Sequence, residues 1–227
     1  MSNEQLDHIR DALASGPISA ARGDKRPAFE GRLFEKHMDS DGRIALFAKR
    51  CASSGGEVHF SDSPEALKNL LDALLEDGSS IAIAGTETLA LRLEVDFSTL
   101  LPGSCACSKA EKLELDELFD LDTAITGTVL GIAETGSLLL FSEGDGARLA
   151  SLVPEKHIAL LWPEQIVPDL LDGAAFLKEK GTGEQPGGMT LISGPSKTAD
   201  IELSLVVGVH GPARLHVIIM GPEPEDR

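Results

Sequence analysis

The residues of this sequence that could bind a ligand or move a proton are concentrated in three glycine-containing loops. They are AGTET at Ala84–Thr88, AETGS at Ala133–Ser137 and SGPSKTADIE at Ser193–Glu202. Glycine lets backbone N–H groups approach a ligand closely, and the hydroxyls of Ser and Thr add donors without charge. Because each loop follows an apolar run, we expect the three loops at the carboxyl ends of strands, where parallel sheets bind their ligands.

Three titratable residues are the candidate catalytic groups: Glu134, Asp200 and His210. His210 lies in the turn GVHGP, and an imidazole on a constrained loop suits proton transfer or hydrogen bonding to a substrate. A histidine that bonds the nearby backbone fits that turn equally well, and Glu134 also fits a solvated loop acid. The residues that we expect to bind a ligand are Gly85, Thr86, Thr135, Gly136, Ser137, Gly194, Ser196, Lys197, Thr198, Glu202 and Gly211.

The stretch SGPSKTADIE has two interpretations. In the first, it starts a helix over 197–207, with a hydroxyl as the cap and Asp200 and Glu202 complementing the helix dipole. Lys197 fits that interpretation less well, since a cation is mildly unfavourable at a helix N-terminus unless it pairs with Asp200 or Glu202. In the second, Lys197 and backbone N–H groups hold an anion. The two acids would repel a highly charged phosphate, so we expect a small carboxylate in a pocket shared with AETGS and His210.

The familiar cofactor and metal motifs are missing from the chain. It has neither G-x-G-x-x-G nor a P-loop, and neither H-E-x-x-H nor a G-x-S-x-G elbow. Its three cysteines (Cys51, Cys105 and Cys107) form no disulfide framework and lack the spacing of an iron–sulfur protein. The pair CAC at 105–107 would need distant partners to hold a metal ion. We therefore expect no metal and no cofactor to be bound by this chain alone.

The histidines outside the loops are interpreted as structural. His216 lies within the last apolar strand. The others have no acid or cysteine partner at ligand spacing, which indicates surface or core positions; they are His8, His37, His59 and His157.

The elements that must position these residues alternate along the chain. Apolar runs predict strands at 57–61, 80–85, 121–128, 131–141, 157–162, 189–194 and 214–220. Helical spacing predicts helices within 32–56 and at 63–78, 86–93, 163–181 and 197–207. This alternation is typical of an α/β protein with three layers, α/β/α, around a mainly parallel sheet. We expect a helix and an extended arm over 1–32, one α/β domain over 33–221 and a disordered tail over 222–227.

Composition limits the partners and the location. The formal net charge is −17, which disfavours nucleic acid and anionic membrane surfaces as partners. No apolar run approaches the roughly 20 residues of a membrane span, and the N-terminus lacks the pattern of a secretion signal. A cytoplasmic location is therefore expected.

Three segments resemble the LUD family: TAITGTVLGIAETGSLLLF, RLASLVPEKHIALLWPEQIV and ISGPSKTADIELSLVVGVHGPARLHVIIM. The resemblance runs in order over about residues 120–220, with a weaker echo over 33–100. G-P-S-[RK]-T-A-D-I-E followed by G-V-H-G-P is its most specific part. The resemblance carries over to Glu134, Thr135 and Gly136, to Gly194–Glu202, and to His210 and Gly211. Lys197 stands where the family often has Arg, so the charge is kept but bidentate anion binding is lost.

The resemblance implies a fold like that of the ribose-5-phosphate isomerase, glucosamine-6-phosphate deaminase and CoA-transferase group. It also implies a role in oxidising L-lactate to pyruvate, together with partner subunits that carry iron–sulfur clusters. A different function also fits the fold: a stand-alone enzyme or binding protein for a small phosphorylated or CoA-linked metabolite. Whether the chain is itself catalytic, and whether it forms a homo-oligomer, stays open at this point.

Overall fold

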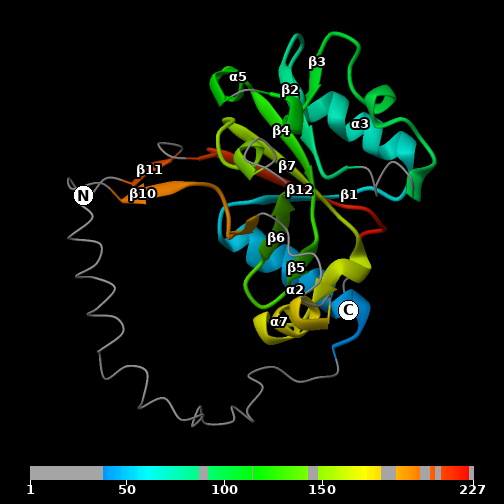
Figure 1. Ribbon diagram of the computed structural model, residues 1–227. Coiled ribbons are helices and arrows are strands. Elements are labelled where there is room, and N and C mark those ends of the chain that lie inside the picture. Colours follow the sequence, from blue (N-terminus) through cyan, green and yellow to red (C-terminus); the bar gives the residue numbers. More distant parts are fainter. Residues whose placement is uncertain are drawn as a thin grey trace, which may run out of the picture. The chain divides into compact units, whose positions relative to one another are not determined.

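A six-stranded, all-parallel sheet forms the centre of the fold (Figure 1). The structure, a computed structural model, describes residues 38–86, 92–113, 115–142, 148–179, 188–199, 205–207 and 211–224. The strands, in their order across the sheet, are β1 (Glu57–Phe60), β12 (Arg214–Ile219), β7 (Lys156–Leu161), β4 (Thr123–Gly127), β2 (Ser80–Ala84) and β3 (Ala106–Lys109). All six residues of β7 are buried, as expected for a strand covered on both faces.

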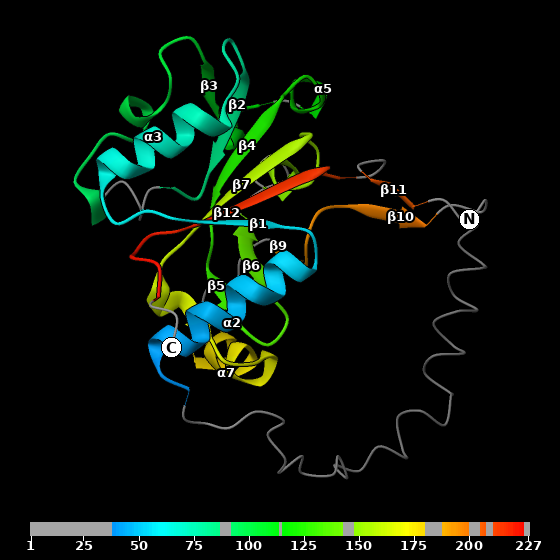
Figure 2. The same ribbon diagram turned by 180° about the vertical axis from the view of Figure 1, so that it is seen from behind.

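Two helices cover opposite faces of this sheet, which confirms the three-layer α/β prediction (Figure 1, Figure 2). Helix α2 (Ser40–Ser53) packs in one core cluster with Ala159, and helix α3 (Pro64–Leu74) packs in another with Ile158. Neighbouring residues of a strand point to opposite faces, so the two helices lie on opposite sides. The 3-10 helix η1 (Phe97–Leu100) lies on the same side of the sheet as α3 and packs in the same core cluster.

Local capping explains where both helices begin. The Asp39 side chain accepts a hydrogen bond from the Gly42 N–H before α2, and the Ser63 side chain accepts one from the Ala66 N–H before α3. Pro64 occupies the first turn of α3, where its missing N–H costs nothing. Both helices were predicted from sequence, the first within 32–56 and the second at 63–78.

A second sheet of four strands lies beside α2 in the same core cluster. Its order is β8 (Ile166–Val167), β5 (Leu130–Ile132), β6 (Ser137–Ser142) and β9 (Gly188–Ile192), and only the β5–β8 pair is parallel. The sequence predicted one continuous strand-like run over 131–141. Instead the chain reverses at AETGS, where Gly136 has a φ of +66°. Glycine adopts this left-handed conformation at low cost.

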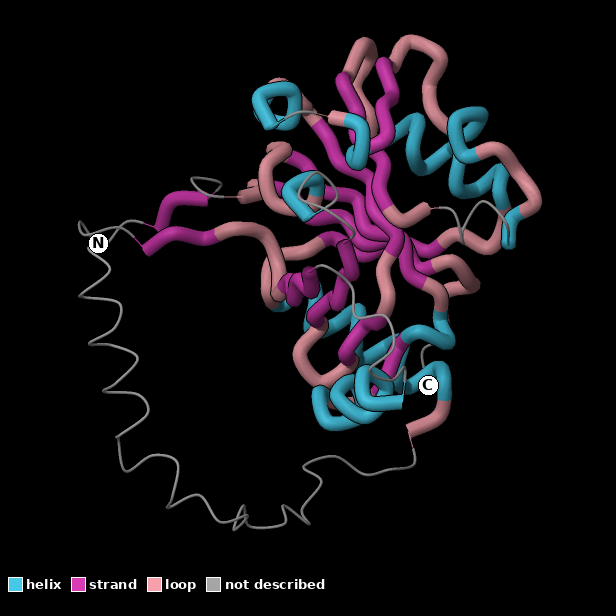
Figure 3. Tube along the Cα trace, viewed as in Figure 1, coloured by secondary structure: helices cyan, strands magenta, loops and turns pink. Residues whose placement is uncertain are grey.

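The helix predicted over 197–207 is wrong for the residues of that stretch that the structure describes, 197–199 and 205–207. They contribute an antiparallel pair, β10 (Lys197–Ala199) and β11 (Leu205–Val207), drawn as strands in Figure 3. Thr198 pairs with Val206, and β-branched residues favour strands over helices. The correction removes the helix N-terminus that the capping interpretation of this stretch required.

The predicted helix over 163–181 begins later than expected. A 3-10 turn, η3 (Pro163–Gln165), and strand β8 come first, and helix α7 then runs over Leu170–Glu179. The residue before a proline avoids helical conformation, and Pro168 follows β8 directly. The Asp169 side chain accepts a hydrogen bond from the Asp172 N–H at the start of α7. The short helices η2 (Ala110–Lys112) and α5 (Leu115–Phe119) complete the described elements.

The predicted N-terminal helix and arm over 1–32 lie outside the described residues. The described part of the chain belongs to one compact unit, Lys36–Arg227. In that part, no helix combines the length and the apolar character that a membrane crossing needs.

Candidate functional site

A hollow of about 810 Å³ opens at the amino ends of β2, β4, β7 and β12, which are neighbours in the parallel sheet. The first residues of three of these strands line it: Thr123, Lys156 and Arg214. The hollow therefore lies at the edge of the sheet opposite to the one where parallel sheets usually bind ligands.

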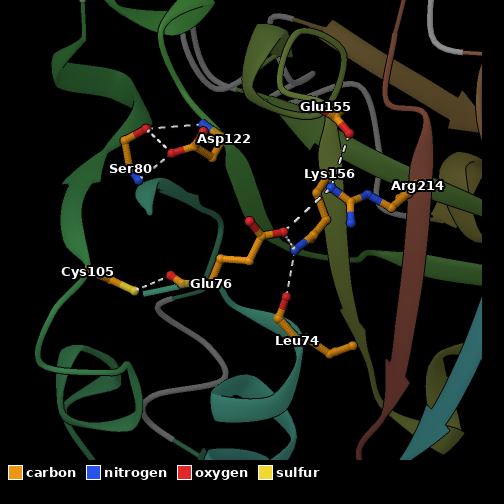
Figure 4. A network of polar contacts seen from close by, with 8 residues as sticks. All are labelled: Leu74, Glu76, Ser80, Cys105, Asp122, Glu155, Lys156 and Arg214. Atoms are coloured by element: carbon orange, nitrogen blue, oxygen red, sulfur yellow. Dashed lines mark hydrogen bonds and ion pairs between the residues drawn. The ribbon is translucent and has the colours of Figure 1, made fainter. Parts of the chain in front are cut away.

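Lys156 is the buried cation of this hollow (Figure 4). It is only 5% exposed, and its Nζ donates a hydrogen bond of 2.6 Å to the carbonyl oxygen of Leu74, at the C-terminus of α3. Helix C-termini carry unpaired carbonyls and partial negative charge, so they attract a cation. Glu76 Oε1 lies 3.7 Å from the same Nζ. A buried ammonium needs such partners to remain charged.

Arg214 joins the same network from the neighbouring strand. Its Nη2 lies 3.1 Å from Glu155 Oε1 and 3.8 Å from Glu76 Oε1, so Glu76 faces both cations (Figure 4). Glu76 and Glu155 are mostly exposed, and exposed ion pairs contribute little to stability. These carboxylates can therefore move when another group competes for Arg214.

Asp122 and Ser80 form a second set of hydrogen bonds near the Lys156 network (Figure 4). Asp122 Oδ2 accepts hydrogen bonds of 2.8 Å from both the backbone N–H and the hydroxyl of Ser80. These two bonds, with a smaller contribution from the charge of Lys156, hold the pKa of Asp122 below its ordinary value. Asp122 thus stays ionised at neutral pH.

Acids outnumber bases among the residues that line the hollow. Four acids (Glu76, Asp77, Asp122 and Glu155) face two bases (Lys156 and Arg214), which makes a formal charge of −2. A phosphate dianion would be repelled here, whereas a neutral or singly charged polar group can reach Arg214.

Two of the predicted loops meet at the C-terminus of α2. The Ser137 and Ser193 hydroxyls lie 2.7 Å apart and bond each other. A Cβ added to Gly136 would come within 2.2 Å of the Cys51 backbone nitrogen, and one added to Gly194 within 2.6 Å of the Ser54 carbonyl oxygen. Close packing against α2 therefore accounts for both glycines.

Gly211, which belongs to the turn GVHGP, joins this group. The Ser196 N–H donates to the Pro212 carbonyl at 2.8 Å, and a Cβ on Gly211 would lie 3.1 Å from Ser196 Cβ. Gly211 also lines the hollow. Gly211 lies shortly before the start of β12, and the C-terminus of α2 lies shortly before the start of β1. The three segments therefore gather at the amino ends of the parallel strands.

AETGS and SGPSKTADIE do follow the carboxyl ends of strands, β5 and β9, but the expectation that these ends belong to the parallel sheet is wrong, because β5, β6 and β9 form part of the second sheet. Only Gly85 and Thr86 follow the carboxyl end of a parallel strand, β2. There the backbone of Gly85 lies so close to Gly127 of β4 that a Cβ on Gly127 would be 1.9 Å from its oxygen.

The remaining candidates fall into three groups. Glu134 and Thr135 lie in the turn of AETGS, where the Glu134 N–H donates to the Pro168 carbonyl and Thr135 is exposed. Lys197 and Thr198 belong to β10. Asp200, Glu202 and His210 lie outside the described residues, so their roles, and the ligand-binding roles of the whole set, stay predictions.

Sequence reasoning missed the network around Lys156. The signal that could have found it is a charged residue at the first position of an otherwise apolar strand, as in KHIALL and RLHVII. His157 is a core residue, as predicted. It is fully buried with Nε2 2.8 Å from Thr126 Oγ1, and burial lowers its pKa to about 4. His59, by contrast, does have an acid nearby, since it lies beside His216 and Glu57.

Known proteins with similar sequences cover nearly the whole chain. Lactate utilization protein C of Shouchella clausii is 35% identical over 221 residues, which are 95% of each chain. Lactate utilization protein C of Halalkalibacterium halodurans is 30% identical over 98% of this chain and 96% of that protein. A crystal structure of a DUF162 family protein from Deinococcus radiodurans matches with a TM-score of 0.58 and 24% identity, over 81% of this chain and 99% of that one. That likeness supports the α/β fold.

The family model named LUD domain matches residues 44–220, which include most of α2, both sheets and the edge of the parallel sheet where the hollow opens. The chain therefore belongs to the LUD domain family.

Proposed function

We propose that this chain acts in lactate utilization, as a component without an iron–sulfur cluster in a system that oxidises L-lactate to pyruvate. The observation that carries the proposal is the 35% identity to a lactate utilization protein C over 95% of both chains. Identity of that extent covers the fold as a whole and is not confined to one loop motif.

The cysteines support a role apart from electron transfer. An iron–sulfur cluster is usually held by four cysteine thiolates, and this chain has three cysteines. Cys51 lies on the buried face of α2, where burial raises the pKa of its thiol to about 11. Cys105 packs on the α3 side of the sheet. The clusters of the proposed system would therefore be carried by partner subunits.

Within this role, we propose that the chain binds a small carboxylate at the amino edge of the sheet. Gly211 lies next to Ser196 and also lines the hollow that contains Arg214. A ligand bound at Gly211 would therefore contact both the loop of Ser196 and the hollow. Lys197 is the first residue of β10 and follows Ser196 directly in the chain, so we propose it as a further contact of the carboxylate. The acidic lining argues against a phosphorylated metabolite, which was the alternative ligand class.

Growth on lactate tests the role. Deletion of the gene should abolish growth with L-lactate as the sole carbon source and leave growth on glucose unchanged. The tagged protein, purified from lactate-grown cells, should bring with it proteins that contain iron and acid-labile sulfide. Unimpaired growth of the deletion strain on L-lactate would refute the proposed role.

Binding of the carboxylate is tested separately, by calorimetric titration of the full chain with L-lactate and with pyruvate. The Lys197→Ala variant should bind about tenfold or more weakly, as expected for the loss of one charge-assisted hydrogen bond. Lys49→Ala, which removes an exposed lysine of α2, is the control and should bind like the wild type. Equal affinities of Lys197→Ala and the wild type would place the ligand elsewhere.

A further inference from the structure

Glu57, His59 and His216 lie on one face of the parallel sheet. The first two belong to the edge strand β1, and His216 belongs to its neighbour β12. Glu57 and His59 are two residues apart on β1, so their side chains leave the strand on the same side. His216 on β12 is the parallel register partner of Glu57, and side chains of directly paired residues share a face. Pairing of β1 with β12 thus brings His216 beside two residues that are far from it in the sequence, and Figure 1 shows the two strands next to each other.

The spacing of the two imidazoles matches that of two ligands on one metal ion. His59 Nε2 lies 3.2 Å from His216 Nδ1, and the ring planes are tilted by 30°. A tetrahedral ion with bonds of about 2.0–2.1 Å to nitrogen holds two such donors about 3.3 Å apart. The backbone therefore needs no movement to place these two nitrogens on an ion.

The carboxylate of Glu57 completes a set of three donors. Its Oε2 lies 3.7 Å from His216 Nδ1, and the three donor atoms all lie within 4.8 Å of one another. The His216 side chain is only 7% exposed, whereas that of Glu57 is 64% exposed. Glu57 can therefore rotate toward an ion that the two histidines hold.

We propose that Glu57, His59 and His216 form a binding site for one divalent transition-metal ion of the zinc class. Two imidazole nitrogens and one carboxylate are a donor set that zinc prefers, whereas magnesium and calcium prefer oxygen donors alone. Three protein ligands leave a fourth position for water or for an oxygen of a ligand. The proposal replaces the prediction from sequence that the chain has no metal ligands, and it does not depend on the proposed role in lactate utilization.

The surroundings of the three residues are compatible with a cation. Lys156 and Arg214 are the positive charges that act on His216, and each is paired with an acid, Glu76 or Glu155. Glu57 adds a negative charge of its own. Without a metal ion, the two imidazoles bond each other through one proton. An ion would take the place of that proton, so the ligands are preorganised.

Calorimetric titration of the untagged full chain with Zn²⁺ tests the site. We expect one ion per chain for the wild type, and at least tenfold weaker binding for His59→Asn and for Glu57→Gln, since even changes beyond the ligands weaken metal sites by 10–100-fold. Both variants alter side chains that are at least partly exposed. Their circular dichroism and thermal unfolding without metal should match those of the wild type.

A matched control separates this site from the thiols. Cys105 and Cys107 on or beside β3 could bind Zn²⁺ by themselves, so the double variant Cys105→Ser/Cys107→Ser should retain the wild-type stoichiometry and affinity. Co²⁺ should give the visible absorption of a tetrahedral nitrogen and oxygen site, without a thiolate charge-transfer band. Equal binding by the wild type and His59→Asn, or loss of binding in the cysteine variant, would overturn the proposal.

Discussion

Single glycines hold two distant segments against the end of one helix. Gly136 and Gly194 both have positive φ, and both lie where a Cβ would strike the backbone at the C-terminus of α2. In a LUD family member these positions fall within the loops that the sequence singled out for ligand binding. At the residue scale their first task is packing, because no other residue fits the space.

A pair of glycine variants separates backbone conformation from crowding. Gly136→Ala should lower the free energy of unfolding by about 3 kcal/mol or more, because it combines a left-handed φ with a clash against Cys51. Gly78 also has positive φ but nothing within 4 Å of an added Cβ, so Gly78→Ala should cost only about 1–2 kcal/mol. Urea denaturation measures both values. Equal losses would exclude crowding at Gly136 as the cause.

The buried His157 makes stability depend on pH in a defined window. Burial lowers its pKa to about 4 in the folded chain, whereas an unfolded histidine has a pKa of about 6.5. Above pH 6.5 both states are neutral; as the pH falls from 6.5 to 4, the unfolded chain takes up the proton first. Stability should therefore fall across this window, by up to about 3 kcal/mol.

The His157→Gln variant tests this assignment. Glutamine keeps a polar group near Thr126 Oγ1 but does not titrate. The free energy of unfolding, measured by urea denaturation between pH 5 and 7, should fall less steeply with decreasing pH in the variant than in the wild type. Identical slopes would mean that another group causes the pH dependence.

At the scale of elements, strand β7 and helix α3 are joined by a buried polar contact. Lys156 opens β7, and its Nζ donates to the carbonyl of Leu74 at the last turn of α3. The contact satisfies a helix-end carbonyl that has no partner within the helix. It also sets the position of Glu76 at the rim of the hollow, because Glu76 follows α3 and faces the same Nζ.

Replacing Lys156 tests the importance of that contact. Lys156→Met should lower the free energy of unfolding by about 1–3 kcal/mol, because the Leu74 carbonyl loses its buried partner. Lys68→Met is the matched control: Lys68 forms an exposed i,i+4 pair with Asp72, so its loss should cost less than about 0.5 kcal/mol. Equal costs in chemical denaturation would contradict a special role for Lys156.

At the scale of the whole molecule, the chain is an acidic α/β domain with a polar hollow and a separate pair of histidines. Its net charge of −17 makes positively charged or neutral surfaces the favourable partners.

The purified chain alone should be colourless and should not oxidise L-lactate. The reason is that it has too few cysteines for an ordinary cluster site and no dinucleotide motif. Reduction of an artificial electron-accepting dye in the presence of L-lactate is the measurement. Lactate-dependent reduction by the isolated chain would contradict the subunit role, whereas activity that returns only with the partner proteins would support it.

Local patterns in the sequence determined most of the parallel sheet and its helices. The continuous apolar runs of β7 and β12 and the spacing of Ile44, Phe47 and Cys51 identify their elements without tertiary information, because strand burial and helix amphipathicity recur over a few residues. The loops AETGS and SGPSK were also chosen from sequence, and they do lie together through Ser137 and Ser193.

Only the tertiary structure decided how those pieces are placed. Lys197–Ala199 and Leu205–Val207 are strands and not parts of a helix, because each satisfies the backbone N–H and C=O groups of the other. AETGS and SGPSK lie near the amino edge of the parallel sheet, and not at its carboxyl edge as predicted, because the strands β5, β6 and β9 belong to a second sheet. His59 and His216 are 157 residues apart in the chain and 3.2 Å apart in space. Sequence patterns are local, whereas strand pairing joins residues at any separation, so contacts of this kind exist only once the sheet has formed.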